Sequence, residues 1–362
     1  MEMFSKEDIN AAKNYKYNGV DDSILIKLFY RRFWNWLIEF FPLSLAPNLI
    51  TFIGFLFEVV SFIVSLVYSE CLTVPLPSWV CIFNGVCLCI YQTLDNLDGK
   101  QARRTGSSSA LGQFFDHGCD AITGVSELIK AAASFNLGCG KETFYFVFLM
   151  GVGFFLTSYE EYVTHAFYLG YINGPDEGLT LIWVAHILVG FFPSLRQYVQ
   201  SKYVFILFFM GVGLTVGMIL FNVIKKSLTS NDKSVMKRAL ISILPCLISV
   251  KIFLSLASSP STPYKNPFFT MSAGYVLQYG SQIIIVSFLT KRGPLRTFPL
   301  TMIVLWAVAL AALFLPRVAS LEHLWEGYYV LVVLIMVTFD IRVIRGLSKG
   351  LEIPVFTLKK KQ

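Results

Sequence analysis

The stretch that decides the fold runs from Asp95 to Asp120 and reads DNLDGKQARRTGSSSALGQFFDHGCD. It joins two hydrophobic segments. Asp95 and Asp98 are three residues apart, and Asp116 and Asp120 are four apart, so each pair lies on one face of a helix. We therefore expect four carboxylates at the adjoining ends of two helices, with the rest of the chain as an apolar scaffold around them.

Composition places this scaffold in a membrane. Of the 362 residues, 55% are hydrophobic and 15% aromatic, and the mean hydropathy is +0.61. These values exclude a soluble globular protein and predict an all-α, polytopic integral membrane protein. The net charge is +7, but the basic residues are spread over short connections rather than gathered in one arm, which argues against nucleic-acid binding.

The apolar segments predict about ten transmembrane helices of roughly 20 residues each. Before the first of them, residues 22–43 mix Trp, Phe and Leu with charged residues, a pattern typical of an amphipathic helix that lies in the membrane interface. The expected spans are residues 50–69, 79–95, 109–134, 142–164, 179–193, 203–224, 239–257, 268–290, 297–315 and 325–344.

Lys and Arg are distributed unevenly between the two sides of this arrangement. With a cytosolic amino terminus, 17 of them fall in the cytosolic connections and tail, and five fall on the opposite side. The positive-inside rule therefore places both termini and the aspartate stretch at the cytosolic face. We expect a cytosolic amino terminus with the interfacial helix (1–46), catalytic helices (47–194), carboxy-terminal helices for lipid access or a dimer interface (195–345) and a basic tail (346–362).

That tail ends in Lys359, Lys360 and Lys361. The run is either a dilysine retrieval signal or a solvated basic end that supports the topology. Both interpretations stay open.

Four carboxylates at membrane depth need cations or protons to coexist. An all-oxygen ligand set favours Mg²⁺, Mn²⁺ or Ca²⁺ over zinc, and four aspartates can hold two such ions for phosphoryl displacement. Gly99, Ala102 and Gly112 are small enough to let a phosphate approach the backbone, and the Arg103 guanidinium can bind a diphosphate. The predicted chemistry is metal-assisted transfer that involves a diphosphate.

The spacing of these residues resembles a known signature. Asp95-x2-Asp98-Gly99-x2-Ala102-Arg103-x8-Gly112-x3-Asp116-x3-Asp120 is similar at all eight fixed positions to the motif of the CDP-alcohol phosphatidyltransferase family. The run GKQARRTGSSSALGQFFDHGCD, with the later Glu160-Glu161-Tyr162 and the segment from Tyr168 to Gly178, resembles the eukaryotic choline and ethanolamine phosphotransferases.

This resemblance implies transfer of phosphocholine or phosphoethanolamine from CDP-choline or CDP-ethanolamine to diacylglycerol, giving phosphatidylcholine or phosphatidylethanolamine and CMP. It implies a homodimer in the endoplasmic reticulum or Golgi membrane, with two Mg²⁺ ions, or Mn²⁺ in their place. By matching positions, the metal ligands are Asp95, Asp98, Asp116 and Asp120, and the CDP contacts are Gly99, Ala102, Arg103, Gly112 and Asn48.

Two residues are candidates for the general base. The fourth aspartate, Asp120, is the usual candidate in the wider family, but a metal-bound carboxylate is a poor base. His117 follows the third aspartate directly, and a neutral imidazole titrates near the working pH, so we favour His117. The alternative is that His117 only orients Asp116 or Asp120.

Other polar residues in the apolar segments divide into binding and structural groups. Glu161, with the aromatic residues Phe167, Tyr168 and Tyr171 after it, could hold a choline or ethanolamine cation, or it could belong to helix packing and an interfacial aromatic belt. Glu127 and Lys130 predict a structural ion pair. His165, His186 and His323 show no ligand spacing and are interpreted as structural.

Two other functions compete with this prediction. Another CDP-alcohol transferase would use inositol, glycerol or serine as its acceptor. A cation-coupled transporter would place its acidic residues near the bilayer midplane between repeats, and no repeat is visible here. The sequence does not separate choline from ethanolamine.

Overall fold

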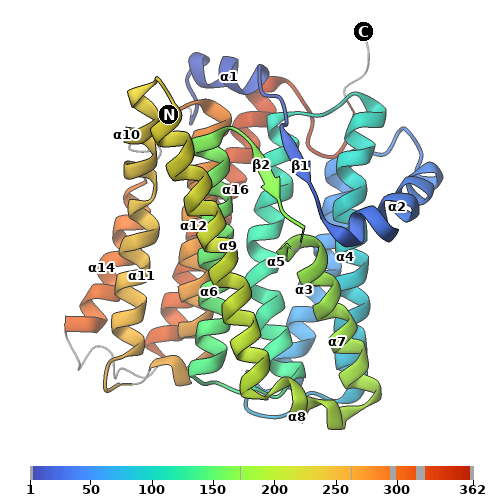
Figure 1. Ribbon diagram of the computed structural model, residues 1–362, viewed down its shortest axis with the longest axis vertical. Helices are drawn as coiled ribbons and strands as arrows, with labels where there is room; N and C mark the ends of the chain where they lie inside the picture. The colour runs from blue at the N-terminus through green and yellow to red at the C-terminus, as the bar shows by residue number, and fades with distance from the viewer. Residues whose placement is uncertain (1–2, 172, 262, 294–298, 315–322, 359–362) are drawn as a thin grey trace.

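Long apolar runs form helices because each backbone N–H and C=O in lipid needs a partner within the protein. The computed structural model, which describes residues 3–171, 173–261, 263–293, 299–314 and 323–358, shows these helices standing side by side (Figure 1). Within the described residues, helix occupies each of the ten predicted intervals. The prediction of an all-α polytopic membrane protein is confirmed.

The first half of the bundle contains the aspartate stretch. Its helices are α3 (Pro47–Tyr68), α4 (Ser78–Thr105), α5 (Ala110–Ser134), α6 (Lys141–Thr164) and α7 (Leu179–Phe191). The second half follows the short α8 (Arg196–Val199). Its helices are α9 (Lys202–Thr229), α10 (Lys233–Ser242), α11 (Leu244–Ala257), α12 (Pro267–Thr290), α14 (Leu300–Phe314) and α16 (Leu324–Leu351).

Five stretches of the described chain are long and apolar enough to cross a membrane by length and composition alone. They are α3, α4, α6, α9 and the combined α10–α11, Lys233–Ala257. The charged groups on α5 and the shortness of α7, both expected from the sequence, explain why these two helices are not in that set.

The two halves pack together through α12. Nearly every residue of this helix from Phe269 to Thr290 is buried, because α5, α6 and α16 surround it. In contrast, α9 packs mainly on α6 and leaves many of its apolar side chains exposed. The helices after residue 195 therefore support the aspartate-bearing helix directly, while their division into a separate domain stays a prediction.

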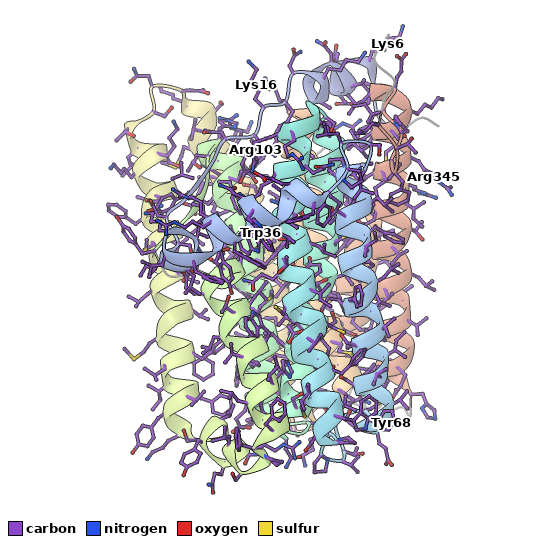
Figure 2. The ribbon with its side chains drawn as sticks, turned by 90° about the vertical axis from the view of Figure 1, so that its right-hand side faces the viewer. Lys6, Lys16, Trp36, Tyr68, Arg103 and Arg345 are labelled. Atoms are coloured by element: carbon purple, nitrogen blue, oxygen red, sulfur yellow. The ribbon has the colours of Figure 1, made fainter. Side chains whose placement is uncertain are left out.

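The amino-terminal segment begins at one end of this bundle, where α1 lies, and continues along its side. After α1 (Lys6–Lys13), helical turns η1 (Ile26–Tyr30), α2 (Arg31–Leu37) and η2 (Ile38–Phe40) run across the other helices (Figure 2). Their outward side chains, including Leu28, Phe29 and Trp36, are exposed, as expected for a helix that lies in the membrane interface.

A small parallel sheet was not predicted. Strand β1 (Gly19–Asp21) pairs with β2 (Phe167–Leu169), with Gly19 opposite Phe167. These strands are three residues long and lie about 150 positions apart in the chain, so neither shows a local strand pattern. Their pairing joins the amino-terminal segment to the loop after α6.

A buried charge cluster ties the first half together below this end. Lys130 Nζ lies 2.6 Å from both Glu58 Oε2 and Glu127 Oε2, and His186 Nε2 lies 2.8 Å from Glu127 Oε1. These four side chains come from α3, α5 and α7 and are at most 1% exposed. The structural ion pair between Glu127 and Lys130 and the structural role of His186 are confirmed, and Glu58 is a partner that was not anticipated.

Candidate active site

The four aspartates meet because α4 and α5 are antiparallel neighbours joined by a short turn. The side chain of Ser109 caps α5 by accepting a hydrogen bond of 3.1 Å from the backbone N–H of Gly112. Asp95 and Asp98 lie in the last turns of α4, and Asp116 and Asp120 lie in the first turns of α5. All four line one cavity of about 1430 Å³.

Two of the carboxylates accept a hydrogen bond. Each of the other two has a bare oxygen, that is, a buried oxygen without a hydrogen-bond partner among the described residues. Thr51 Oγ1 donates to Asp98 Oδ2, and Tyr91 donates to Asp120 Oδ1 at 2.5 Å. In the described part of the chain, Asp95 Oδ1 and Asp116 Oδ1 are buried without a partner. Because a buried carboxylate oxygen is costly without a donor or a cation, these orphaned oxygens fit a bound metal.

The first turns of α5 also bring a histidine to this group. Ligand atoms of Asp116, His117 and Asp120 all lie within 4.8 Å of one another, a spacing that can hold a divalent cation. His117 Nε2 lies 2.8 Å from Gln113 Nε2, and its ring packs on Phe167 at 5.4 Å between centroids. The imidazole is therefore held beside the carboxylates by one polar and one aromatic neighbour.

The predicted nucleotide contacts line the same cavity. Asn48, Gly99, Ala102, Arg103 and Gly112 all belong to its wall. A Cβ on Gly99 would lie 3.5 Å from Arg103 Nη1, and one on Gly112 would lie 3.6 Å from Asn48 Oδ1. The two glycines therefore leave the Arg103 guanidinium and the Asn48 amide open to a ligand.

Part of the wall comes from segments that were not predicted as site residues. Tyr15, Tyr17 and Asp21 from the amino-terminal segment line the cavity, as do residues 353–358 except Phe356. The Phe356 ring packs against Phe52 at 5.2 Å and against Phe115 at 5.6 Å, so it fixes the tail beside the neighbours of Thr51 and Asp116. No local signal marks these segments, since they reach the site only through tertiary packing.

The motif from Asn173 to Gly178 contributes Pro175 and Asp176 to the cavity wall and also has a structural role. The Asn173 side chain accepts a hydrogen bond of 2.8 Å from the Asp176 N–H, and Glu177 accepts 2.6 Å and 3.1 Å bonds from the Ser23 hydroxyl and the Leu25 N–H. This motif therefore anchors the amino-terminal segment. Burial, with the Asp21 carboxylate adding, raises the pKa of Asp176 to about 7.

Glu161 is not among the residues that line this cavity. It is buried on α6, and of the aromatic residues predicted to accompany it only Phe167 belongs to the wall. Glu161 nevertheless lies close enough to act on that wall. Burial raises the pKa of Tyr17 to about 12, and the charge of Glu161 adds to this effect.

Several known proteins are similar to this chain. The family profile described as CDP-alcohol phosphatidyltransferase matches residues 44–171. An uncharacterized CDP-alcohol phosphatidyltransferase class-I family protein 1 from Dictyostelium discoideum is 32% identical over 363 aligned residues, which cover 96% of this chain and 93% of that protein. The chain belongs to the CDP-alcohol phosphatidyltransferase family. This membership confirms the resemblance that the eight signature positions indicated.

Other relatives in the CDP-alcohol phosphatidyltransferase family have more specific names. Choline/ethanolaminephosphotransferase 1 of Arabidopsis thaliana is 44% identical over 178 residues, which are 49% of this chain and 45% of that protein. CDP-diacylglycerol–serine O-phosphatidyltransferase of Encephalitozoon cuniculi is 35% identical over 181 residues, which are 50% of this chain and 47% of that protein. The chain therefore matches about half the length of each of these two relatives.

Proposed function

We propose that this protein is a choline/ethanolamine phosphotransferase. It would transfer phosphocholine from CDP-choline, or phosphoethanolamine from CDP-ethanolamine, to diacylglycerol and release CMP. The observation that carries this proposal is the convergence of four carboxylates, two with bare oxygens, with Arg103 on one cavity in a membrane helix bundle. The 44% identity with the Arabidopsis protein of that name supports the choice within the family.

Asp95, Asp98, Asp116 and Asp120 would hold two Mg²⁺ ions, or Mn²⁺ in their place. When bound, the ions would offset the negative charge of the diphosphate and of the departing CMP. Arg103 would bind the diphosphate oxygens, with Gly99, Ala102 and Gly112 allowing close approach and Asn48 contacting the nucleotide. The chain thereby binds and orients the donor so that little motion is needed during transfer.

His117 would take the proton of the acceptor. The diacylglycerol hydroxyl oxygen forms a bond to the phosphorus that carries the choline or ethanolamine, and the bond from this phosphorus to the bridging oxygen of CMP breaks. The hydroxyl proton passes to the imidazole, and the bridging electron pair leaves with CMP. Asp120 is the alternative base, but its Oδ1 already accepts a hydrogen bond from Tyr91.

The headgroup site is proposed to include Glu161. A carboxylate behind the Tyr15 and Tyr17 wall would favour a quaternary or primary ammonium group, and aromatic faces would add cation–π attraction. The charge of Glu161, which adds to the raised pKa of Tyr17, supports this role. Its position outside the cavity wall means that the carboxylate would act through these tyrosines.

The cavity is proposed to open at the cytosolic face of the endoplasmic reticulum or Golgi membrane. Lys6, Lys16, Arg103 and Arg345 gather toward one end of the bundle and Tyr68 lies at the other (Figure 2), which supports the positive-inside assignment. The run from Lys359 to Lys361, which is either a retrieval signal or a solvated basic end, lies outside the described residues. The homodimer stays a proposal, and the mass of the detergent-solubilised protein would test it.

One assay tests the function directly. Purified protein with Mg²⁺ and diacylglycerol should convert radiolabelled CDP-choline or CDP-ethanolamine to the corresponding phospholipid, and the Asp98→Asn variant should not. The runner-up is transfer to a soluble acceptor, which the Encephalitozoon relative favours. Phosphatidylserine or phosphatidylinositol formed from CDP-diacylglycerol, with no product from CDP-choline or CDP-ethanolamine, would overturn the proposal.

A further inference from the structure

A second cavity, lined in part by residues of α1 and α10, shares no lining residue with the catalytic cavity. Both helices lie at the same end of the bundle (Figure 1). Its volume is about 490 Å³. Residues of α1, of α10 and of the turn after α12 line it. Its charged residues are Glu7, Asp8, Lys237, Arg238, Lys291 and Arg292.

Only part of this positive charge is balanced. Arg292 donates to the Asp8 carboxylate and, at 2.9 Å, to the Met3 carbonyl. Arg238 has a single acidic neighbour, Asp232, at 4.0 Å, and its Nε is buried without a partner among the described residues. In that same part of the chain, no ion pair involves Lys237 or Lys291. Lys237, Lys291 and the weakly paired Arg238 therefore line this cavity, and Glu7 is the one acidic lining residue that is not paired with Arg292.

The cations act on a common region. Burial lowers the pKa of His165 at the end of α6, and the charges of Arg238, Lys226 and Lys291 lower it further. These charges come from the ends of α9 and α12 and from α10. Cations from three helices therefore act on one side chain at this end of the bundle, whereas the positive-inside rule requires only that cations lie on this side.

The surroundings of the cavity favour a ligand with an apolar part. On α10, next to Lys237 and Arg238, Met236 and Leu240 are exposed, and Leu244 at the start of α11 is exposed as well. In a membrane protein such side chains contact lipid. A ligand that fills the cavity with an anionic group could continue along these apolar side chains.

We propose that this cavity binds the phosphate group of an anionic phospholipid from the adjacent leaflet. The guanidinium of Arg238 and the ammonium groups of Lys237 and Lys291 would donate to its oxygens, as charge-assisted hydrogen bonds require. The acyl chains would lie against Met236 and Leu240. Such a lipid would join α1, α10 and the end of α12 at a site distinct from the catalytic cavity.

Binding of radiolabelled dioleoyl phosphatidic acid to the purified full chain in uncharged detergent tests this proposal. We expect Lys237→Gln with Lys291→Gln to raise the apparent Kd roughly thirtyfold, because each cation near a lipid surface contributes about a factor of five. The matched control is Lys225→Gln with Arg345→Gln, which removes two exposed cations outside this cavity. We expect it to change the Kd less than about threefold, because salt screens distant charges.

Three results would overturn the proposal: equal losses in the two double variants, equal binding of dioleoyl phosphatidylcholine by the unaltered protein, or displacement of the lipid by millimolar inorganic phosphate. The last result would assign the cavity to free phosphate. Unchanged thermal unfolding of both double variants shows that any loss of binding comes from the missing charges.

Discussion

Helix α5 carries two groups of buried charges that differ in what neutralises them. Near its start, Asp116 and Asp120 join Asp95 and Asp98 of α4, and among the described residues no Lys or Arg forms an ion pair with any of the four. Two turns beyond Asp120, Glu127 lies within 2.8 Å of both Lys130 and His186, and Lys130 also holds Glu58. The first group faces a cavity, whereas the second is packed inside the protein.

This difference distinguishes carboxylates that can bind a cation from charged residues that hold helices together. A buried carboxylate needs a compensating charge, and the deep cluster finds that charge within the protein, so it can fix α3, α5 and α7 relative to one another. The aspartates at the cavity leave two oxygens bare, which makes them available to cations that arrive with or before the substrate. Substitutions of the aspartates should therefore lower activity and leave stability unchanged, whereas substitutions in the deep cluster should lower stability.

The largest effect is expected at Asp98. Asp98→Asn should reduce turnover by about 10³-fold or more, because it removes the charge of a carboxylate that we propose as a metal ligand. In the absence of metal, the thermal stability of this variant should be unchanged or slightly higher, since the substitution also relieves repulsion among the carboxylates. Initial rates at several Mg²⁺ concentrations and thermal unfolding with and without Mg²⁺ measure both. A variant that lost stability along with activity would contradict the separation.

A somewhat smaller loss is expected at His117. His117→Ala should lower kcat by roughly 10²- to 10³-fold, within the usual contribution of a general base, while thermal stabilisation by Mg²⁺ stays intact. Gln113→Ala removes the polar neighbour of the imidazole and is the companion variant. Near-normal turnover of His117→Ala would exclude it as the base, and loss of the Mg²⁺ effect would show that it orients Asp116 or Asp120.

Substitutions in the deep cluster should mainly lower the stability of the protein. Lys130→Met leaves Glu58 and Glu127 without their shared cation and should reduce the free energy of unfolding by about 3 kcal/mol. Unfolding in a graded detergent mixture measures this loss. The triple variant Glu58→Gln, Glu127→Gln, Lys130→Met removes the charges of all three side chains and should recover most of the stability. Equal stability of Lys130→Met and the unaltered protein would show that the cluster is not a support.

The positions of the four aspartates could be predicted from the sequence, whereas most of the cavity walls around them could not. The eight signature positions lie within 26 residues, and helical spacing alone brings the aspartates onto two faces that one turn can join. The ion pair of Lys130 with Glu127 also follows from helical spacing, because the two residues are three positions apart. Glu58 could not be assigned, because it lies 72 residues from Lys130 in the chain.

The walls of the cavity depend on contacts between distant segments. Strand β1 pairs with β2 across almost 150 residues, and Phe356 reaches Phe52 from the other end of the chain. Such contacts leave no periodic pattern, so the segments around Tyr15 and Val355 look like ordinary loops in the sequence. The charged cavity lined by α1 and α10 also depends on contacts between distant segments. Its cations could not be recognised as a site in the sequence, because they also fit the positive-inside rule.

The smallest effect is expected at an ion pair near the surface, where solvent weakens the attraction that dominates the deep cluster. The Arg292 guanidinium beside Asp8 lowers the pKa of that carboxyl from 3.8 to about 2. Because the folded protein holds the charged form, the contribution is complete above about pH 4 and is lost as the pH falls toward 2. Asp8→Asn should therefore cost at most about 1 kcal/mol at pH 7, with a smaller difference at pH 3. Thermal unfolding of Asp8→Asn and of the neighbouring control Glu7→Gln at both pH values measures it, and a difference that did not change with pH would show that the carboxylate charge has no part in holding α1.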